Sequence, residues 1–340
     1  MTTAHRIVLA SRPKGAPTAD NFRHESFDLP APGAGEVALR TVWLSLDPYM
    51  RGRMNDGPSY AAATGIGEVM TGEVVAEVTE SHDDAFKPGD LVQARIGWAS
   101  HGVSAGADLR KLPTDNPAPL QSYLGILGMP GLTAFVGVND LLEVQSGQTV
   151  VISAATGAVG TMAGQLAKAK GARVIGVAGG PEKCDFAVKE LGFDLCLDHR
   201  SPALRDEMAM AAPDGIDRYF ENVGGSTLSA VIGNMAEFGR IAVCGMVAWY
   251  NGKNTDTAPP LPVVWRNVLT KRLRVEGFLI FDRYDRLDAF LSEVGPMVAD
   301  GTIKYRETVM DGLDNAPDAF LSMLEGGNFG KQLVRVGDDP

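Results

Sequence analysis

The segment Val150–Val177 constrains the fold of this chain more than any other. It opens with three apolar residues, as the buried strands of parallel sheets do, and a turn of small residues follows. A stretch with apolar residues at helical spacing then runs to Gly171, and a second apolar run reaches Val177. This order predicts one strand–helix–strand unit of a doubly wound parallel sheet, with glycines at its first strand-to-helix turn.

The small-residue turn is a variant of the dinucleotide fingerprint GxGxxG. Ala155 takes the place of the first glycine, whereas Gly157 and Gly160 keep the second and third places. The second glycine lets the backbone approach a pyrophosphate, and the third lets the helix pack closely. Together with the amides of Ala158 and Val159, at the start of the helix, they form a candidate anion site. Taken alone, the glycines also fit an ordinary strand–turn–helix connection.

The end of the second strand discriminates between the two nicotinamide dinucleotides. An NAD site usually carries Asp or Glu there, but this chain has Ala178–Gly180. Lys183 follows, and Arg200 comes after the next apolar run. Small residues and cations favour a 2′-phosphate, and therefore NADPH. The alternatives are a solvated Lys183 and an acidic role for its neighbour Glu182.

Charge and cysteine usage exclude several classes of protein. The net charge of −11 argues against nucleic acid or an anionic membrane as a partner, because both require a basic surface. No apolar run is long enough to span a bilayer, and no secretory leader is visible. The cysteines Cys184, Cys196 and Cys244 are spread singly, which is typical of a reducing compartment and predicts a cytoplasmic protein.

The length of 340 residues indicates two domains. Residues 1–125 contain strand-like runs without helical stretches between them, which predicts an antiparallel, barrel-like domain. The tail 297–340 is expected to rejoin this domain. The expected strands are Arg6–Ala10, Glu36–Leu46, Val69–Val78, Leu91–Ile96, Thr302–Val309 and Lys331–Val336, with a tail helix at Asp314–Glu325.

Residues 126–296 alternate between strand-like and helical stretches, which predicts an α/β domain with a parallel sheet. A helix is expected at Gly131–Leu142, before the first strand. The expected strands are Val150–Ser153, Arg173–Val177, Leu195–Leu197, Arg218–Phe220, Arg240–Cys244 and Arg274–Ile280.

A set of short segments is spread in a fixed order over nearly the whole chain. They are LSLDPYMRGRM (Leu44–Met54), FKPGDLV (Phe86–Val92), GMPGLTA (Gly128–Ala134), AATGAVG (Ala154–Gly160), ENVGG (Glu221–Gly225), GRIAVCG (Gly239–Gly245) and GGNFGKQLV (Gly326–Val334). This set resembles the medium-chain dehydrogenase/reductase superfamily, and within it the zinc-free prostaglandin reductase and curcumin reductase branch. The resemblance implies a GroES-like domain paired with a Rossmann domain, assembled as a homodimer. It also implies NADPH-dependent reduction of C=C bonds conjugated to a carbonyl group, in small enones and alkenals.

The resemblance implies cofactor-binding residues as well. Gly157–Gly160 would hold the pyrophosphate, and Lys183 would meet the 2′-phosphate. His199 stands where relatives usually have Tyr, and it could contact the phosphate together with Arg200. The residues expected on the nicotinamide side are Asn222, Cys244, Gly245, Tyr250, Phe278, Leu279 and Asn328.

Two tyrosines are candidate catalytic donors. By resemblance, Tyr250 falls on the tyrosine that the family places beside the substrate carbonyl, where a hydrogen-bond donor stabilises developing negative charge. A loop tyrosine packed on Trp249 is the alternative for this residue. Tyr49 is the second candidate donor, and a packed aromatic ring beside Pro48 is its alternative.

No metal is expected. Zinc members of the superfamily need cysteine and histidine ligands in the first domain, but this chain has no cysteine there. The histidines of that domain, His5, His24, His82 and His101, show no ligand spacing. Two other functions remain open at this point: a quinone reductase on the same scaffold, and a protein that binds NADPH without catalysis.

Overall fold

The computed structural model describes residues 3–113 and 118–340, and the chain divides into two compact units. The first unit comprises Met1–Gly125 and Glu307–Pro340, and the second comprises Ile126–Arg306. The first boundary lies where the sequence placed it, whereas the second lies after Arg306 instead of after residue 296. Hydrogen bonds explain the difference, because Gln165 and Lys304 exchange two of them at 2.7 and 2.8 Å within the second unit.

The first unit is built mainly of antiparallel strands. In its described residues the main sheet has the order β14-β15-β3-β4-β5-β7, with β6 paired to β3, and β1 and β2 form a separate two-stranded sheet. The strands are β1 (Thr3–Leu9), β2 (Phe22–Asp28), β3 (Glu36–Leu46), β4 (Val74–Ser81), β5 (Leu91–Ala94), β6 (His101–Ala105), β7 (Arg110–Lys111), β14 (Glu307–Asp311) and β15 (Lys331–Arg335). The α-helices are α1 (Met50–Arg53) and α9 (Ala316–Leu324).

The sequence prediction was wrong for several elements of this unit. Strand β4 begins at Val74 and not at Val69, because the chain at Gly72 passes so close to Leu44 and Trp98 that a Cβ would lie 2.9 Å from Leu44 Cδ1. Strand β14 begins only at Glu307, and it runs parallel to β15, since α9 carries the chain back between them. Strands β2, β6 and β7 were missed because they are short or carry mostly polar side chains.

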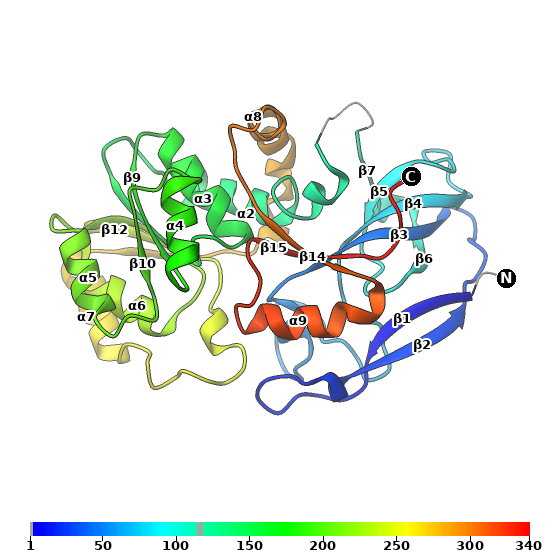
Figure 1. Ribbon diagram of the computed structural model, residues 1–340, viewed down its shortest axis with the longest axis horizontal. Coiled ribbons are helices and arrows are strands. Elements are labelled where there is room, and N and C mark those ends of the chain that lie inside the picture. The colour runs from blue at the N-terminus through cyan, green and yellow to red at the C-terminus, as the bar shows by residue number, and fades with distance from the viewer. Residues whose placement is uncertain (1–2, 114–117) are drawn as a thin grey trace. The chain divides into compact units, whose positions relative to one another are not determined.

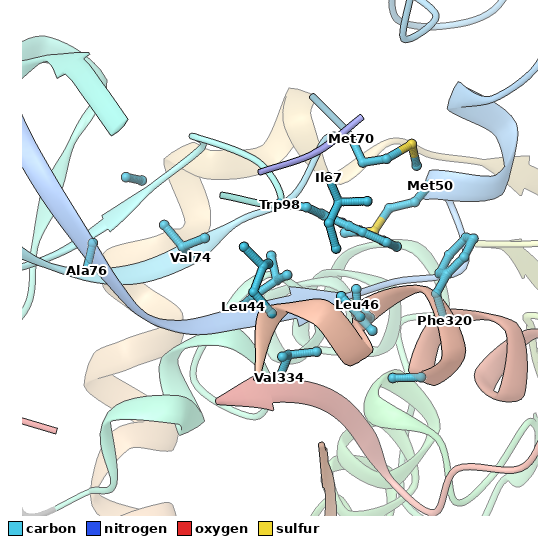
Figure 2. Close-up of a cluster of buried hydrophobic side chains, with 14 of the residues drawn as sticks. Ile7, Leu44, Leu46, Met50, Met70, Val74, Ala76, Trp98, Phe320 and Val334 are labelled. Carbon is cyan, nitrogen blue, oxygen red and sulfur yellow. The ribbon is translucent and has the colours of Figure 1, made fainter. Parts of the chain in front are cut away.

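The hydrophobic core of the first unit gathers around the fully buried Trp98. Its indole stacks on Phe22 at a ring-centroid distance of 5.5 Å and meets the ring of Phe320, on α9, edge to face at 5.5 Å. Figure 2 shows Trp98 between Ile7 and Met50, with Phe320 beyond the end of the indole. Aromatic contacts of this kind hold the tail helix α9 on the core of the first unit.

The second unit is a parallel sheet with helices on both faces. The sheet has six strands in the order β10-β9-β8-β11-β12-β13, which confirms the predicted doubly wound fold. The strands are β8 (Thr149–Ser153), β9 (Arg173–Ala178), β10 (Leu195–Asp198), β11 (Ile216–Glu221), β12 (Met235–Val243) and β13 (Arg274–Gly277). The α-helices are α2 (Met129–Val136), α3 (Ala158–Ala169), α4 (Pro181–Lys189), α5 (Leu204–Ala211), α6 (Gly225–Ile232), α7 (Leu261–Lys271) and α8 (Leu287–Ala299).

The two faces of this sheet carry different helices. In Figure 1, α3 lies above the sheet and α5, α6 and α7 lie below it. A buried cluster on the lower side joins apolar residues of α5 and α6 to strand residues such as Val151 and Tyr219. The strand order reverses at β8, between β9 and β11, and ligands of such sheets bind at the carboxyl ends of the strands at this place.

Several element ends in this unit differ from the expectation; β12, for example, begins at Met235 and not at Arg240. The helix expected at Gly131–Leu142 continues after Val136 as a π-helical turn, Gly137–Leu141. Gly137 lies against the Phe220 ring, so that a Cβ would come within 2.3 Å of it, and this close contact fills the space that a side chain would occupy. Strand β13 ends at Gly277, because a 3₁₀ segment begins at Ile280. Within 3–113 and 118–340, no helix combines the length and the apolar character that crossing a bilayer requires.

Candidate active site

The glycine turn after β8 packs as the fingerprint predicts. A Cβ on Gly160 would lie 2.2 Å from the Ala154 carbonyl oxygen, so only glycine fits at this place. Gly157 is the N-cap of α3, and the turn bends at Ala154, whose φ is 49°. The first amides of α3 therefore point toward the carboxyl edge of the sheet, as in sites that bind a pyrophosphate.

Cationic groups converge at the carboxyl ends of β9 and β10. A Cβ on Gly179 would lie 2.9 Å from Nε2 of His199, and one on Gly180 would lie 3.0 Å from Nη1 of Arg200. Burial lowers the pKa of Lys183, and the charge of Arg200 lowers that pKa further. Burial likewise lowers the pKa of His199, and the positive charges of Arg200 and Lys183 lower that pKa further. The charge of Arg200 thus disfavours the charged forms of both Lys183 and His199, so a bound anion would be stabilised beside these three side chains.

Asp198 places a carboxylate at this edge, but its Oδ1 already accepts hydrogen bonds from the protein backbone. Oδ1 of Asp198, the last residue of β10, accepts hydrogen bonds from the backbone amides of Gly180 and Arg200, each at 3.0 Å. These bonds fix the two loops that carry the cations. Asp198 was missed from the sequence because it follows the third strand of the unit and not the second.

The nicotinamide-side residue Asn222 is tied to the end of β8. Its backbone amide donates to Ser153 Oγ at 2.7 Å, and its side-chain Nδ2 donates to the Ser153 carbonyl at 2.8 Å. The Ser153 hydroxyl lies 3.1 Å from the Phe220 carbonyl oxygen and 3.2 Å from Oε1 of Glu221. Ser153 is fully buried, so this network holds Asn222 in one orientation.

The network includes a buried carboxyl group on Glu221. Burial raises the pKa of Glu221, whereas the amides of Val223 and Gly224 and the neighbouring hydroxyl groups oppose this shift. Burial, with the Glu221 charge adding to it, raises the pKa of the Cys244 thiol to about 12. Cys244 is therefore a protonated, unreactive thiol at neutral pH. Glu221 lies in the ENVGG motif, but no role for it could be predicted from the sequence; the available signal was an acidic residue at the end of a buried strand.

Tyr250 folds back over the turn that follows β12. The Met246 amide donates to the Tyr250 hydroxyl oxygen at 3.4 Å, and a Cβ on Gly245 would lie 3.3 Å from the same oxygen. The structure thus places the Tyr250 hydroxyl beside Gly245. Trp249 covers Gly224, where a Cβ would lie 2.8 Å from its ring.

Phe278 and Leu279 follow β13 at the same edge of the sheet. The Phe278 amide donates to the Val243 carbonyl at 3.4 Å, and its ring meets Phe220 edge to face with centroids 6.4 Å apart. Leu279 is partly exposed. These two residues therefore lie at the same edge of the sheet as Asn222, which follows β11, and Cys244, which follows β12.

Tyr49 and Asn328 belong to the first unit. Tyr49 packs against the core of that unit, and burial raises its pKa well above the ordinary value, with the carboxylates of Asp47 and Glu73 adding to the shift. The phenol therefore stays protonated and can act as a donor at neutral pH. The Asn328 side chain donates to the Gly330 carbonyl at 2.7 Å.

No group of three or more His, Cys, Asp and Glu side chains that could hold a metal ion occurs among the residues that the structure describes.

Comparison with known protein families agrees with this architecture. One family model, described as the N-terminal domain of oxidoreductase, matches residues 5–112, and another, described as zinc-binding dehydrogenase, matches residues 158–294. The chain is 49% identical over 337 residues to the NADPH-dependent curcumin reductase of Escherichia coli, with 98% of this chain and 97% of that protein covered. The chain belongs to the medium-chain dehydrogenase/reductase superfamily.

Other members of this superfamily extend the similarity. Rat prostaglandin reductase 1 is 40% identical over 342 residues, with 99% of this chain and 100% of that protein covered. The crystal structure of CurA from Vibrio vulnificus in complex with NADPH superposes with a TM-score of 0.94 at 45% identity, covering 98% of this chain and 100% of that one. The branch of the superfamily expected from the sequence motifs is confirmed.

Proposed function

We propose that this medium-chain reductase uses NADPH to reduce the C=C bond of α,β-unsaturated ketones and aldehydes. The main support for the proposal comes from the edge of the parallel sheet where the carboxyl ends of the strands lie. There, Lys183, His199 and Arg200 converge beside a glycine turn, and small residues occupy the place of the acid that an NAD site would carry. The similarity to curcumin reductase and prostaglandin reductase supports the substrate class.

The residues present fit NADPH. Gly160 lets the start of α3 pack against the backbone of the turn, because a Cβ there would lie 2.2 Å from the Ala154 carbonyl oxygen, and the first amides of α3 stay available to an anion. Lys183, Arg200 and His199 would meet the 2′-phosphate, and the amides of Ala158 and Val159 would meet the pyrophosphate. When bound, NADPH supplies a hydride. The nicotinamide side would be bound by Asn222, the Cys244–Gly245 turn, Phe278, Leu279 and Asn328.

Tyr250 would serve as the catalytic donor. Its hydroxyl group lies over Gly245, at the carboxyl end of a parallel strand, where ligands of such sheets bind. A donor aimed at the substrate carbonyl oxygen stabilises the charge that develops there while the C=C bond is reduced. Tyr49, whose phenol stays protonated, would be a second donor.

The decisive experiment follows the hydride. The enzyme is supplied with stereospecifically deuterated NADPH and matched panels of enones and quinones, and the label is located by NMR. We expect the label on the β-carbon of the saturated ketone. Label on the carbinol carbon would show carbonyl reduction instead, faster turnover of quinones would show a quinone reductase, and binding without turnover would show a non-catalytic protein.

A Tyr250→Phe variant tests the donor. It keeps the ring and removes the hydroxyl, and we expect turnover to fall about ten-fold or more. The Michaelis constant for NADPH should change less than turnover, because the lost bond is made to the reacting substrate. An unchanged turnover would remove Tyr250 from the mechanism.

A Lys183→Ala variant tests cofactor choice. A charge-assisted bond to a phosphate is worth about 1.5–3 kcal/mol, so the Michaelis constant for NADPH should rise about ten- to a hundred-fold, with little change for NADH. Lys189 on the same helix pairs with Asp185 at 2.7 Å and is exposed, so Lys189→Ala is the matched control and should alter neither constant. Equal use of NADPH and NADH by the unaltered protein would contradict the assignment.

We also propose that the chain forms a homodimer through α7 and β13. Leu261, Trp265 and Leu269 recur every four residues on α7 and are 63%, 60% and 76% exposed. Strand β13 is an edge of the parallel sheet, and an open edge beside an apolar helix face is suited to pairing with a second copy. Sedimentation should give a dimer for the parent protein and for Met210→Glu, an equally exposed site on α5, but a monomer for Trp265→Glu. A monomeric parent protein would contradict the proposal.

A cytoplasmic location is part of the same proposal. Cys184, Cys196 and Cys244 are all free thiols, as is usual for proteins of reducing compartments. Cell fractionation with compartment markers tests this location, and recovery of the protein outside the cytoplasm would contradict it.

A further inference from the structure

The carboxyl group of Glu221 has no role in the proposed function, although it is buried beside the nicotinamide-side residues. Glu221 ends β11 and is 2% exposed. Its Oε1 accepts hydrogen bonds from the backbone amides of Val223 at 2.7 Å and Gly224 at 3.0 Å, and it lies 3.2 Å from the Ser153 hydroxyl. Burying a carboxyl group is costly, and the donors gathered on one oxygen offset part of that cost.

The same residue joins the ends of three strands. The Glu221 carbonyl oxygen accepts the amide of Cys244 at 2.9 Å and the amide of Gly245 at 3.1 Å, both after β12. Through Ser153 its side chain also reaches the end of β8. Ser153 in turn receives both the backbone amide and the side-chain amide of Asn222. Glu221 is thus linked to the groups expected to face the nicotinamide in two ways. Its backbone carbonyl holds Cys244 and Gly245 directly, and its side chain reaches Asn222 through Ser153.

The turn that Glu221 holds has little rigidity of its own. Gly224 and Gly225 follow each other with φ values of 79° and 53°. Two consecutive glycines in left-handed conformations gain much conformational freedom if their hydrogen bonds are lost. An acceptor fixed at the end of β11 removes that freedom from the turn.

We propose that Glu221 is the positioning residue for the nicotinamide half of the cofactor. Its side chain acts through Ser153 on Asn222 and through the amides of Val223 and Gly224, and it does not touch the cofactor itself. This role rests on the proposed function, because it requires NADPH as the ligand. The adenosine half would be held by Lys183, His199 and Arg200, and the loops that carry these residues are fixed by a different carboxylate, Asp198, which accepts the amides of Gly180 and Arg200.

The two halves of the cofactor can be tested separately. Titration calorimetry would measure NADPH and adenosine 2′,5′-bisphosphate, which carries only the adenosine half with its 2′-phosphate, against the parent protein and Glu221→Ala. We expect the dissociation constant of NADPH to rise about ten-fold or more, because two buried amides lose their acceptor. The dissociation constant of adenosine 2′,5′-bisphosphate should stay unchanged.

Two further variants control for charge and for position. In Glu221→Gln the new amide oxygen can still accept both backbone amides, so NADPH affinity should stay within about three-fold of the parent protein. Asp217, on the same strand, accepts the Thr149 amide at 2.8 Å at the opposite end of the sheet. Asp217→Ala therefore removes a similar bond away from the site and should alter neither ligand.

Each result decides the role. An unchanged NADPH affinity in Glu221→Ala, or an equal loss of affinity for both ligands, overturns the positioning role and leaves the proposed function standing. A parent protein that binds neither ligand overturns the proposed function and this role with it. If Glu221→Ala does not fold, Ser153→Ala, which removes the acceptor of the Asn222 amide, must show the same selective loss, and its absence overturns the role.

Discussion

A buried ion pair that joins the chain's tail to the first unit offers a sharp test of the structure. Lys331 on β15 and Asp47 after β3 lie 2.6 Å apart, and their side chains are 4% and 8% exposed. The Lys331 ammonium also donates to the Leu46 carbonyl at 2.6 Å, and the Ser45 hydroxyl donates to Oδ2 of Asp47. The substitution Asp47→Asn removes the negative charge with almost no change of shape.

The expected loss of stability depends on the hydrogen bonds that the Lys331 ammonium keeps in this variant. Breaking a buried pair by removing one partner costs about 3–5 kcal/mol, because an uncompensated charge stays buried. In Asp47→Asn the Leu46 carbonyl and the new amide oxygen can still accept from Lys331, so we expect the lower end, about 3 kcal/mol. That is a large share of the 5–15 kcal/mol that usually separates folded from unfolded chains. The measurement is the free energy of unfolding from urea titration at constant pH, and the midpoint should fall without a change of slope.

The same strand provides a matched control. Arg335 pairs with Asp311 at 2.6 Å, but these side chains are 50% and 69% exposed. Asp311→Asn makes the same chemical change in solvent and should cost no more than about 1 kcal/mol. The double variant Asp47→Asn with Lys331→Met should be more stable than Asp47→Asn alone, because it also removes the buried positive charge that has lost its carboxylate partner. If Asp47→Asn costs no more than Asp311→Asn, the burial argument is wrong.

Three further predictions concern packing, pH and metals. A Cβ on Gly164 would lie 1.8 Å from Phe193 Cζ, so Gly164→Ala should lower the free energy of unfolding by about 1–3 kcal/mol. Adding Phe193→Leu should restore part of this loss, and a melting temperature of Gly164→Ala equal to that of the parent protein would contradict the prediction. Burial raises the pKa of Glu73 above its value in the unfolded chain, so its contribution to stability is present at low pH and lost as pH rises through the raised pKa. Glu73→Gln should therefore be more stable than the parent protein at pH 8 and indistinguishable below the ordinary glutamate pKa, as measured by urea titration at both pH values. Prolonged chelation should leave the reductase rate unchanged, since the first unit has no cysteine, and a loss restored by added zinc would refute metal-free catalysis.

Local patterns in the sequence were sufficient for the parallel sheet. Strands β8 and β9 are apolar runs bounded by turn residues, and helical spacing fills the interval between them, so the order of these elements could be read from short windows. The glycine turn could be read in the same way, because the need for Gly160 arises from the backbone of Ala154, only a few residues away. The cations Lys183 and Arg200 were also found, because parallel strands bring their carboxyl ends to one edge.

The first unit was harder to predict, for a physical reason. Strands such as β2 and β6 are held by pairing with distant partners, and their side chains alternate too weakly to reveal a buried face. The parallel pairing of β14 with β15 depends on α9 packing its Phe320 against Trp98, a contact between opposite ends of the chain. No local window contains that information.

The amino-acid sequence by itself determined the class of fold and the glycine turn after the first strand of the parallel sheet, because periodicity and turn chemistry act over a few residues. Only the tertiary structure decided which polar groups are buried together. Ser153 and Glu221 are 68 residues apart in the chain, yet they share a hydrogen bond. Lys331, near the C-terminus, forms an ion pair with Asp47, near the N-terminus. The energy of a buried polar group depends on partners that folding brings within reach, and so the positioning role of Glu221 could be inferred only from the folded chain.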